Sequence, residues 1–287
     1  MEMVKDINPT LIKRKGNGQI NIKSGNKVDT VVKWTIWVLT ALTILAFFFF
    51  DYTGLQIQRA ISETLYNLRV MFFEPALTHF SWGEAFYQVG ITLGLGVLAT
   101  IFGAIIALFL SLLAAENLSK PWISKMIRVF VAFIRAVPTV LWVLIFAIAA
   151  GLGSEAAVLG MLFHSIAYLV KAFSEAIEEV NPGIIEALRS TGSSWWHIVV
   201  HGILPSTFTY FLSWTFLRFE INFSVAVAMG AAAGAGGIGF ELFMASGFYF
   251  DLREVGLITY AILIIAIILE VISTRLKNRY FPSSVKA

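Results

Sequence analysis

The chain has 287 residues, of which 58% are hydrophobic and only 14% are charged, and it carries a net charge of +3. Soluble domains contain about a quarter charged residues, so this sequence has too few polar side chains to cover a water-facing surface, which excludes an ordinary soluble enzyme and a disordered chain. It contains no cysteine, which excludes a disulfide framework, a thiolate nucleophile and a cysteine metal site.

At the amino terminus a basic segment precedes an apolar one. Residues 1–33 hold seven Lys and Arg against three acids, and we expect a flexible cytoplasmic tail. The run Trp34–Phe50 is long enough for a membrane helix. Because no small-residue cleavage site comes after this run, a retained first span is favoured over a signal peptide.

Residues 51–84 are expected on the outer face of the membrane, so that 34–84 combine the first span with an outer segment. Apolar side chains recur at roughly helical spacing, which is typical of an amphipathic helix on the membrane surface. Ser81 followed by Glu84 matches the capping box that starts a helix. The apolar positions are Leu55, Ile57, Ile61, Leu65, Leu68 and Phe72.

The second span is predicted at about 86–114, where small residues recur every four positions on one helical face. Such a face lets helix backbones approach closely in lipid. We therefore expect this face to pack against another helix. Its residues are Ala99, Gly103, Ala107 and Ser111, and Gly90 and Gly94 extend it.

Basic residues mark the next segment, 119–135. Lys125, Arg128 and Arg135 are three and seven positions apart and share one helical stripe, which predicts a helix at the cytoplasmic interface. A third span is predicted over 136–152, with Pro138 in its first turn, where the missing N–H leaves nothing unpaired.

Three further spans complete an all-α, polytopic membrane protein of about six transmembrane helices. The amino-terminal tail, the segment before the third span and the carboxyl tail are basic, whereas the outer segments are not. By the positive-inside rule, both termini are expected in the cytoplasm. The further spans are about 156–174, 204–229 and 255–273, in a core of residues 85–275 that leads into a cytoplasmic tail of residues 276–287.

No motif indicates an enzyme. The chain lacks the G-x-x-x-x-G-K-[ST] phosphate loop and the G-x-S-x-G nucleophile turn. His197 and His201 share a helical face, but without a Glu after the first they are weak evidence for zinc. We assign no catalytic residue and no metal ligand. The glycine-rich run 234–239 is either a tight turn between crowded helices or irregular backbone lining a water-filled path.

Residues 175–205 carry the most information. Charged Glu and Arg residues stand beside Trp195 and Trp196, a mixture that suits docking of a protein at the membrane surface. The segment is predicted to form two short amphipathic helices. Pro182-Gly183 would break the first helix, and Gly192 would separate the second helix from the residues after it.

The spacing in this segment resembles the cytoplasmic EAA loop of permease subunits in bacterial ATP-binding cassette importers. The family pattern is E-A-A, three residues, G, nine residues, then I-x-L-P. Leu188 replaces the second Ala, and Gly202 replaces the Ile. The residues that match in register are Glu186, Ala187, Gly192, Leu204 and Pro205.

More closely, the chain resembles the permease of phosphonate importers over roughly residues 85–275. The segments that carry the resemblance are Arg135–Pro138 with Leu141 and Trp142, Lys171–Glu179, Arg218–Asn222 and Gly234–Gly239.

This resemblance implies a type I importer fold in the bacterial plasma (inner) membrane and no enzymatic activity in this chain. The implied partners are a second permease copy, expected to form a homodimer, a dimer of separate ATPases, and an extracellular or periplasmic phosphonate-binding protein. No cofactor is expected here, since the partner ATPase would bind ATP and Mg²⁺. The lipid bilayer is a further expected partner, and no nucleic-acid partner is expected. The residues assigned to ATPase coupling are Glu186, Ala187, Leu188, Gly192, Leu204 and Pro205.

Polar residues in the fifth span are candidates for the translocation path. A charge in mid-membrane costs at least about 2.5–3.5 kcal/mol, so it should face a cavity or a partner. Arg218 and Asn222 are four apart and share a face, whereas Glu220 points about 200° away from Arg218. We therefore expect Arg218 either to pair with another helix or to attract the phosphonate oxyanion. Gly236 and Gly237 complete the candidate path.

Two other functions stay open at this level. The chain could be a permease for another small solute, such as phosphite or methionine. It could also be a membrane scaffold that binds a cytoplasmic partner without transport. Stimulation of the partner ATPase by a loaded binding protein distinguishes a transporter from a scaffold.

Overall fold

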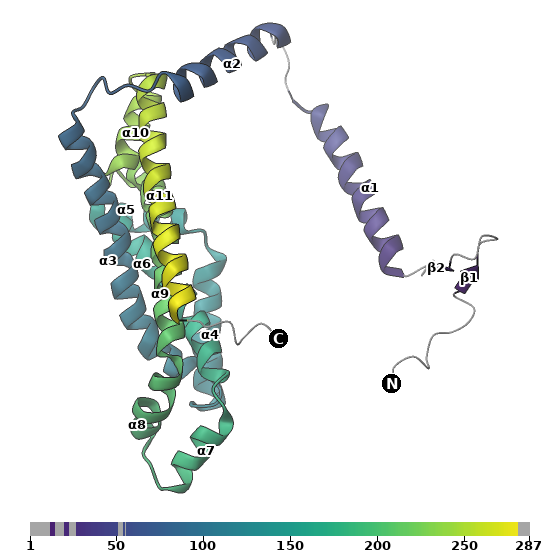
Figure 1. Cartoon of the computed structure of the whole chain (residues 1–287), viewed down its shortest axis with the longest axis vertical. Coiled ribbons are helices and arrows are strands. Elements are labelled where there is room, and N and C mark those ends of the chain that lie inside the picture. The colour runs from purple at the N-terminus through teal and green to yellow at the C-terminus, as the bar shows by residue number, and fades with distance from the viewer. Residues whose placement is uncertain (1–11, 15–19, 23–26, 51–53, 55, 281–287) are drawn as a thin grey trace. The chain divides into compact units, whose positions relative to one another are not determined.

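The structure is a computed structural model that describes residues 12–14, 20–22, 27–50, 54 and 56–280 (Figure 1). The chain divides between Ile61 and Ser62 into two units. Within the described residues, the regular structure is helical except for β1 (Ile12–Arg14) and β2 (Ile20–Ile22), which pair antiparallel. The all-α, polytopic fold is thus confirmed. The short β1–β2 pair in the basic tail was not predicted; most of that tail, Leu55 and residues 281–287 lie outside the described residues.

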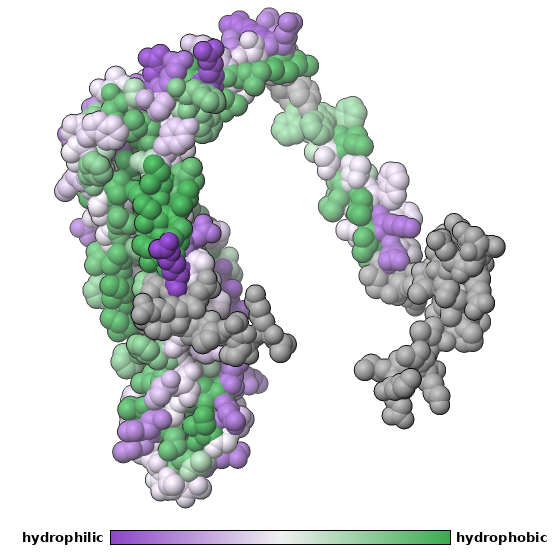
Figure 2. Space-filling model, viewed as in Figure 1, coloured by the Kyte–Doolittle hydropathy of each residue, from purple (hydrophilic) through white to green (hydrophobic). Residues whose placement is uncertain are grey.

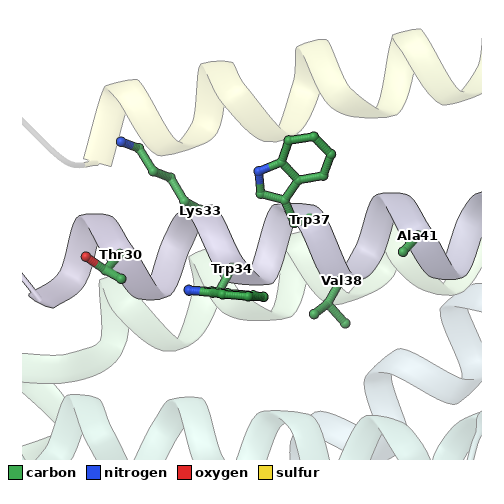
Figure 3. A pocket seen from close by; sticks show the side chains of 6 residues that line it. All are labelled: Thr30, Lys33, Trp34, Trp37, Val38 and Ala41. Carbon is green, nitrogen blue, oxygen red and sulfur yellow. The ribbon is translucent and has the colours of Figure 1, made fainter.

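The first unit contains α1 (Lys27–Phe47), which begins before the predicted start of the first span at Trp34. The hydroxyls of Thr35, Thr40 and Thr43 donate to backbone carbonyls four residues earlier, as Thr40 does to Ile36 at 2.8 Å, so these donors are not left unpaired in lipid. Trp34 and Trp37 are strongly exposed beside Lys33, and they border a pocket lined by α1 residues (Figure 3). Exposed Trp beside Lys is typical of a membrane–water interface.

The amphipathic pattern after α1 forms α2 (Ile57–Phe73), which contains the boundary between the two units. Its predicted apolar positions are exposed among the described residues, as expected for a helix whose apolar face is covered by lipid instead of protein. The end of α2 is fixed to the last helix, because the Tyr260 hydroxyl donates to the Phe72 carbonyl at 2.7 Å.

The second span is α3 (Trp82–Ala114), and its predicted capping box is confirmed: the Glu84 amide donates to the Ser81 hydroxyl, and the Ser81 amide donates to the Glu84 carboxylate at 2.7 Å. The predicted small-residue face is buried. A Cβ on Gly103 would lie 2.8 Å from the Cβ of Ser165, so only a glycine allows this close approach. Gly90 and Gly94 were expected to extend this face, but a Cβ added at either would have no described atom outside its own helix within 4 Å.

The helix at the predicted third span, 136–152, is shorter than predicted. The interfacial helix α4 (Pro121–Ala136) and α5 (Thr139–Ala150) meet at an angle of 89°. Twelve residues reach only about 18 Å, well short of a bilayer core of about 30 Å, so α5 can contribute to a span only together with α4. Pro138 is the N-cap of α5, one position before the first turn.

The core of the second unit is α6 (Ser154–Glu178), which packs against α3, α4, α5 and α9 (Leu204–Ala233). Two more helices, α10 (Ile238–Gly247) and α11 (Leu252–Tyr280), pack on α9. Within the described residues, five helices are long and apolar enough to cross a membrane, or six with the bent pair. Figure 2 shows hydrophobic surface along the middle of this bundle and hydrophilic residues gathered at its ends.

Between α6 and α9 the chain forms α7 (Pro182–Ser190), α8 (Trp195–Ile198) and a π-helical turn, η2 (Val199–Ile203). The first of the two predicted short helices is not separate but forms the end of α6, which stops at Glu178. The second is α7, which begins at Pro182 and ends before Gly192, as predicted. The fifth span begins at Trp195, because α8, η2 and α9 form one continuous helical run.

Candidate coupling surface and buried polar cluster

The exposed face of α7 is the candidate coupling surface. The Asn181 side chain caps the helix by accepting the Gly183 amide at 2.9 Å, and Pro182 supplies a first turn without an unpaired N–H. Ile185 is buried against the bundle, whereas Glu186 and Ala187 are exposed. The helix lies at one end of the bundle, beside α8 (Figure 1), and its exposed side includes Glu186.

The six predicted coupling residues divide into two groups. Glu186, Ala187, Gly192 and Pro205 are exposed, whereas Leu188 and Leu204 pack against the hydrophobic core. Gly192 has φ of +77°, a backbone conformation that strongly favours glycine, and it turns the chain from α7 to α8. The motif therefore combines exposed residues, which can contact a partner, with buried leucines, which attach α7 and the start of α9 to the core.

A loop between α3 and α4 holds α7 and α8 in place. The Arg189 side chain donates to the Asn117 carbonyl at 3.2 Å, and the Trp195 indole donates to the Leu118 carbonyl at 3.0 Å. In turn, the Asn117 amide donates to the carbonyl of Ile177 near the end of α6, at 2.9 Å. Sequence reasoning did not identify this loop, whose polar residues have no distinguishing motif.

An ion-pair network joins the same loop to α4 and α6. Arg128 of α4 pairs with Glu178 of α6, and it also lies 3.7 Å from Glu116. Glu178 accepts the Glu116 amide at 2.7 Å, and the Arg128 Nε donates to the Ala114 carbonyl at 3.1 Å. The ends of α3 and α6 are thus connected to α4 through the half-buried side chains of Arg128 and Glu178.

Deeper in the bundle, Arg218 and Asn222 belong to one buried polar cluster. Arg218 is 2% exposed, and its Nε donates to the Ser165 hydroxyl at 3.0 Å. The Asn222 amide donates to Ser165 at 2.9 Å and to Thr100 at 2.8 Å. The cluster therefore joins α9 to α6 and α3, as expected for mid-membrane polar residues that pair with other helices.

The guanidinium of Arg218 is only partly satisfied. One of its terminal nitrogens, Nη2, is buried without a hydrogen-bond partner in the described structure. The Tyr168 ring lies 5.3 Å from the guanidinium carbon and supplies a cation–π contact, which contributes about 0.5–2 kcal/mol. A buried cation with an unused donor can bind an anion that reaches it.

Glu220 is not brought together with Arg218. It lines a separate open cavity of about 510 Å³ between the start of α5 and α9, together with Thr139 and Ser224. The carboxylate thus faces a different part of the surface, in agreement with the expected 200° separation on the helix.

The glycine-rich loop before α10 packs tightly against α3. The Gly237 amide donates to the Gln88 side chain at 2.9 Å, and the Ile238 amide donates to the Thr92 hydroxyl at 2.9 Å. Gly237 has φ of +78°, and a Cβ there would clash with Thr92. Gly236 is half-buried beside the same helix. Close packing accounts for the glycines here, while a role in a path stays a prediction.

A third polar group lies at the opposite end of the bundle from α7. His79 Nδ1 lies 2.7 Å from Glu254, a fully buried carboxylate that also accepts the backbone amides of Thr78 and His79. Burial raises the pKa of Asp251, but hydrogen bonds from the Thr78 side chain and from backbone N–H groups outweigh it, so the pKa lies below its usual value. This group fixes the loop after α2 to the start of α11.

Comparison with known proteins gives a consistent family. The model described as "Binding-protein-dependent transport system inner membrane component" matches residues 107–285. The phosphate-import permease protein PhnE of Mycolicibacterium smegmatis is 31% identical over 198 residues, which are 68% of this chain and 37% of that protein. The phosphite transport system permease protein PtxC of Stutzerimonas stutzeri is 32% identical over 190 residues, which are 66% of this chain and 68% of that protein.

Solved structures share the fold. The inward-facing MetNI methionine ABC transporter matches with a TM-score of 0.64 and 17% identity over 71% of this chain and 100% of that chain. A bacterial ABC transporter for import of the polysaccharide alginate matches with a TM-score of 0.59 and 14% identity over 88% of this chain and 99% of that chain. At these identities the likeness concerns the fold alone.

Proposed function

This chain belongs to the family of binding-protein-dependent transport system inner membrane components, and we propose that it is the permease subunit of an ATP-driven importer for phosphonate-type anions. As a member it is a multi-pass membrane protein of a non-catalytic subunit family. The matched region, 107–285, contains the coupling surface and the α6 and α9 residues of the buried polar cluster. Transport therefore gives one explanation for two features at different depths of the bundle.

The observation that carries the proposal is the exposed face of α7. An amphipathic helix that buries Ile185 and presents Glu186 at the end of a membrane bundle suits docking into a groove of a partner protein. Its attachment through Arg189 and the Arg128–Glu178 pair transmits a displacement of α7 to α4 and α6. In our proposal the partner is a cytoplasmic ATPase dimer, and both termini of this chain are cytoplasmic.

The proposed substrate is a phosphonate-type oxyanion. Arg218 supplies a buried positive charge with an unused donor, which suits a small anion stripped of water. The two relatives named above are a phosphate-import and a phosphite permease, both for phosphorus oxyanions. Phosphite is therefore the second candidate substrate, favoured by the similarity to PtxC.

The proposed cycle needs three partners. A binding protein delivers the anion from outside, and a second copy of this chain completes the path between the two subunits. The ATPase dimer binds ATP and Mg²⁺, so this chain carries no cofactor of its own. Closure of the ATPases moves the two α7 helices and switches the pair between outward-open and inward-open states.

The test is ATPase stimulation in a reconstituted complex. This chain is placed in nanodiscs with the ATPase and binding protein encoded in neighbouring reading frames, and ATP hydrolysis is measured with binding protein that is empty or loaded with methylphosphonate. We expect loaded binding protein to raise the rate several-fold. Glu186→Ala should remove most of that increase, whereas Glu179→Ala, an exposed acid outside the motif, should retain it. A rate insensitive to the loaded binding protein would indicate a scaffold.

A further inference from the structure

A basic pocket lies between α4 and α6, apart from the residues assigned above to the path. Its volume is about 200 Å³, and its lining includes Arg128, Arg135 and Lys171 with a single acid, Glu175. Arg128 and Arg135 are seven residues apart and share one face of α4. The pocket thus collects three cations that the sequence places on two separate helices.

The positive charge of this pocket is uncompensated at one residue. Arg128 pairs with Glu178, and the Lys171 ammonium lies 3.6 Å from Glu175. Arg135 is exposed and has no ion pair or hydrogen bond to any residue that the structure describes. A mobile anion that enters the pocket would therefore find Arg135 available.

Unpartnered polar atoms connect this pocket with the buried cluster. His164 and Lys171 are seven residues apart on one face of α6, about 10 Å along the helix axis. His164 is adjacent in sequence to Ser165, which binds Arg218, and its Nδ1 is buried without a partner in the described structure. One helix, α6, thus carries polar side chains both beside the buried cluster and in the pocket.

We propose that the α4–α6 pocket is a second anion site on the exit route, in which Arg135 receives a free phosphorus oxyanion after it leaves Arg218. The identity of the anion rests on the proposed function. Arg135 is exposed, so water weakens its attraction for an anion relative to that of buried Arg218. Conduction requires sites that bind well enough to admit an ion and weakly enough to release it, and an exposed arginine meets both conditions.

The test uses the absence of cysteine from the chain. Ala132, which is exposed and lines the pocket, is replaced by cysteine so that the reporter is the only thiol of this chain. The nucleotide-free complex in zwitterionic nanodiscs is then treated with negatively or positively charged methanethiosulfonates. We expect the negative reagent to react several-fold faster, and Arg135→Gln to remove most of that preference. Lys125→Gln, which alters an exposed cation of the same helix outside the pocket lining, should preserve it.

Competition then identifies the ligand. Millimolar methylphosphonate or inorganic phosphate should slow modification of the reporter at constant ionic strength, and Arg135→Gln should abolish the slowing. If neither anion slows it, or if only anionic lipid in the nanodisc does so, the proposal is overturned and the pocket holds a lipid headgroup or no anion. Because the labelling does not depend on transport, the site can fail while loaded binding protein still stimulates the ATPase, and the two results remain distinguishable.

Discussion

Leu188 of α7 fills the space that a side chain at position 202 would occupy. A Cβ added to Gly202 would lie 2.9 Å from the Leu188 Cδ1 atom, closer than side chains tolerate. These are the two positions at which the chain departs from the EAA pattern, where alanine and isoleucine are expected. The departures therefore compensate each other: a larger residue on α7 is matched by a smaller one on η2, and the attachment of the coupling surface is retained.

This compensation predicts a double-mutant cycle. Gly202→Ile should overpack the contact, and Leu188→Ala should leave a cavity, each costing about 1–3 kcal/mol of stability or of α7 attachment. The double variant should recover most of both losses, because it restores the family pairing. Thermal unfolding and stimulated ATPase activity of the reconstituted complex measure the two effects. Strictly additive losses would show that the side chains do not share this space.

The Arg128–Glu178 pair should affect coupling more than substrate recognition. Arg128→Gln leaves Glu178 without its ion-pair partner and loosens the attachment between α4 and α6. We expect stimulated ATP hydrolysis to fall several-fold with little change in the substrate concentration at half-maximal uptake. Lys125→Gln serves as the control on the same helix. A selective change in substrate affinity would contradict this assignment.

Arg218 should set the affinity for the transported anion. A charge-assisted hydrogen bond contributes about 1.5–3 kcal/mol, which corresponds to about 10–100-fold in affinity. Arg218→Gln should therefore raise the KM for methylphosphonate uptake by about that factor, and Arg218→Lys should recover part of it. Ser213→Ala on the same helix is the control. Normal uptake at low substrate by an Arg218→Gln protein that still assembles would remove Arg218 from the path.

Gly237 should be required for packing. Gly237→Ala places a Cβ against Thr92 at a positive φ and should cost about 1–3 kcal/mol. Gly90→Ala is the matched control, because that glycine lies within α3 with open space around it and alanine favours helix by about 0.5–1 kcal/mol. The Tm should thus fall for Gly237→Ala and rise for Gly90→Ala. Equal stability of the two variants would favour an unpacked, water-lined loop.

The Asp251 carboxylate should stabilise the end of the bundle opposite α7 in a pH-dependent way. A carboxyl whose pKa is lowered by folding stabilises the protein above its unfolded value of about 4, and this contribution is lost as the pH falls through the lower folded value. Asp251→Asn should therefore lower the Tm at pH 7, and the difference from the parent chain should shrink as the pH falls from about 4 through the lower folded pKa. A difference independent of pH would assign the effect to packing.

The parts of the fold that obey local rules were predictable from the sequence. The Ser81–Glu84 box starts α3 as expected, and the buried small-residue face of that helix agrees with its spacing alone. Residues 62–73 of α2 and residues 182–190 of α7 are likewise helical, as the spacing of their apolar side chains predicts. Periodicity identifies a helix and its apolar face because both depend on neighbours within a few positions.

The remaining features depend on distant partners. The separate helices α4 and α5 correspond to the predicted interfacial helix and third span, but the 89° angle between them and the shortness of α5 were not predicted. The π-turn at Val199–Ile203 joins α8 to α9 and has no sequence signal of its own. Ser165, which binds both Arg218 and Asn222, is one of many serines, and only the packing of α6 against α9 distinguishes it.

One unbroken helix, α6, carries Ser165 in the middle of the bundle and Glu178 near the coupling surface. These residues are thirteen positions apart, about 20 Å along a rigid axis. A shift of the Glu178 end cannot be absorbed within the helix, so it also alters the contacts that orient the guanidinium of Arg218. Affinity for the anion inside the membrane should consequently depend on whether nucleotide occupies the distant motor subunits, and nucleotide affinity should depend reciprocally on the anion.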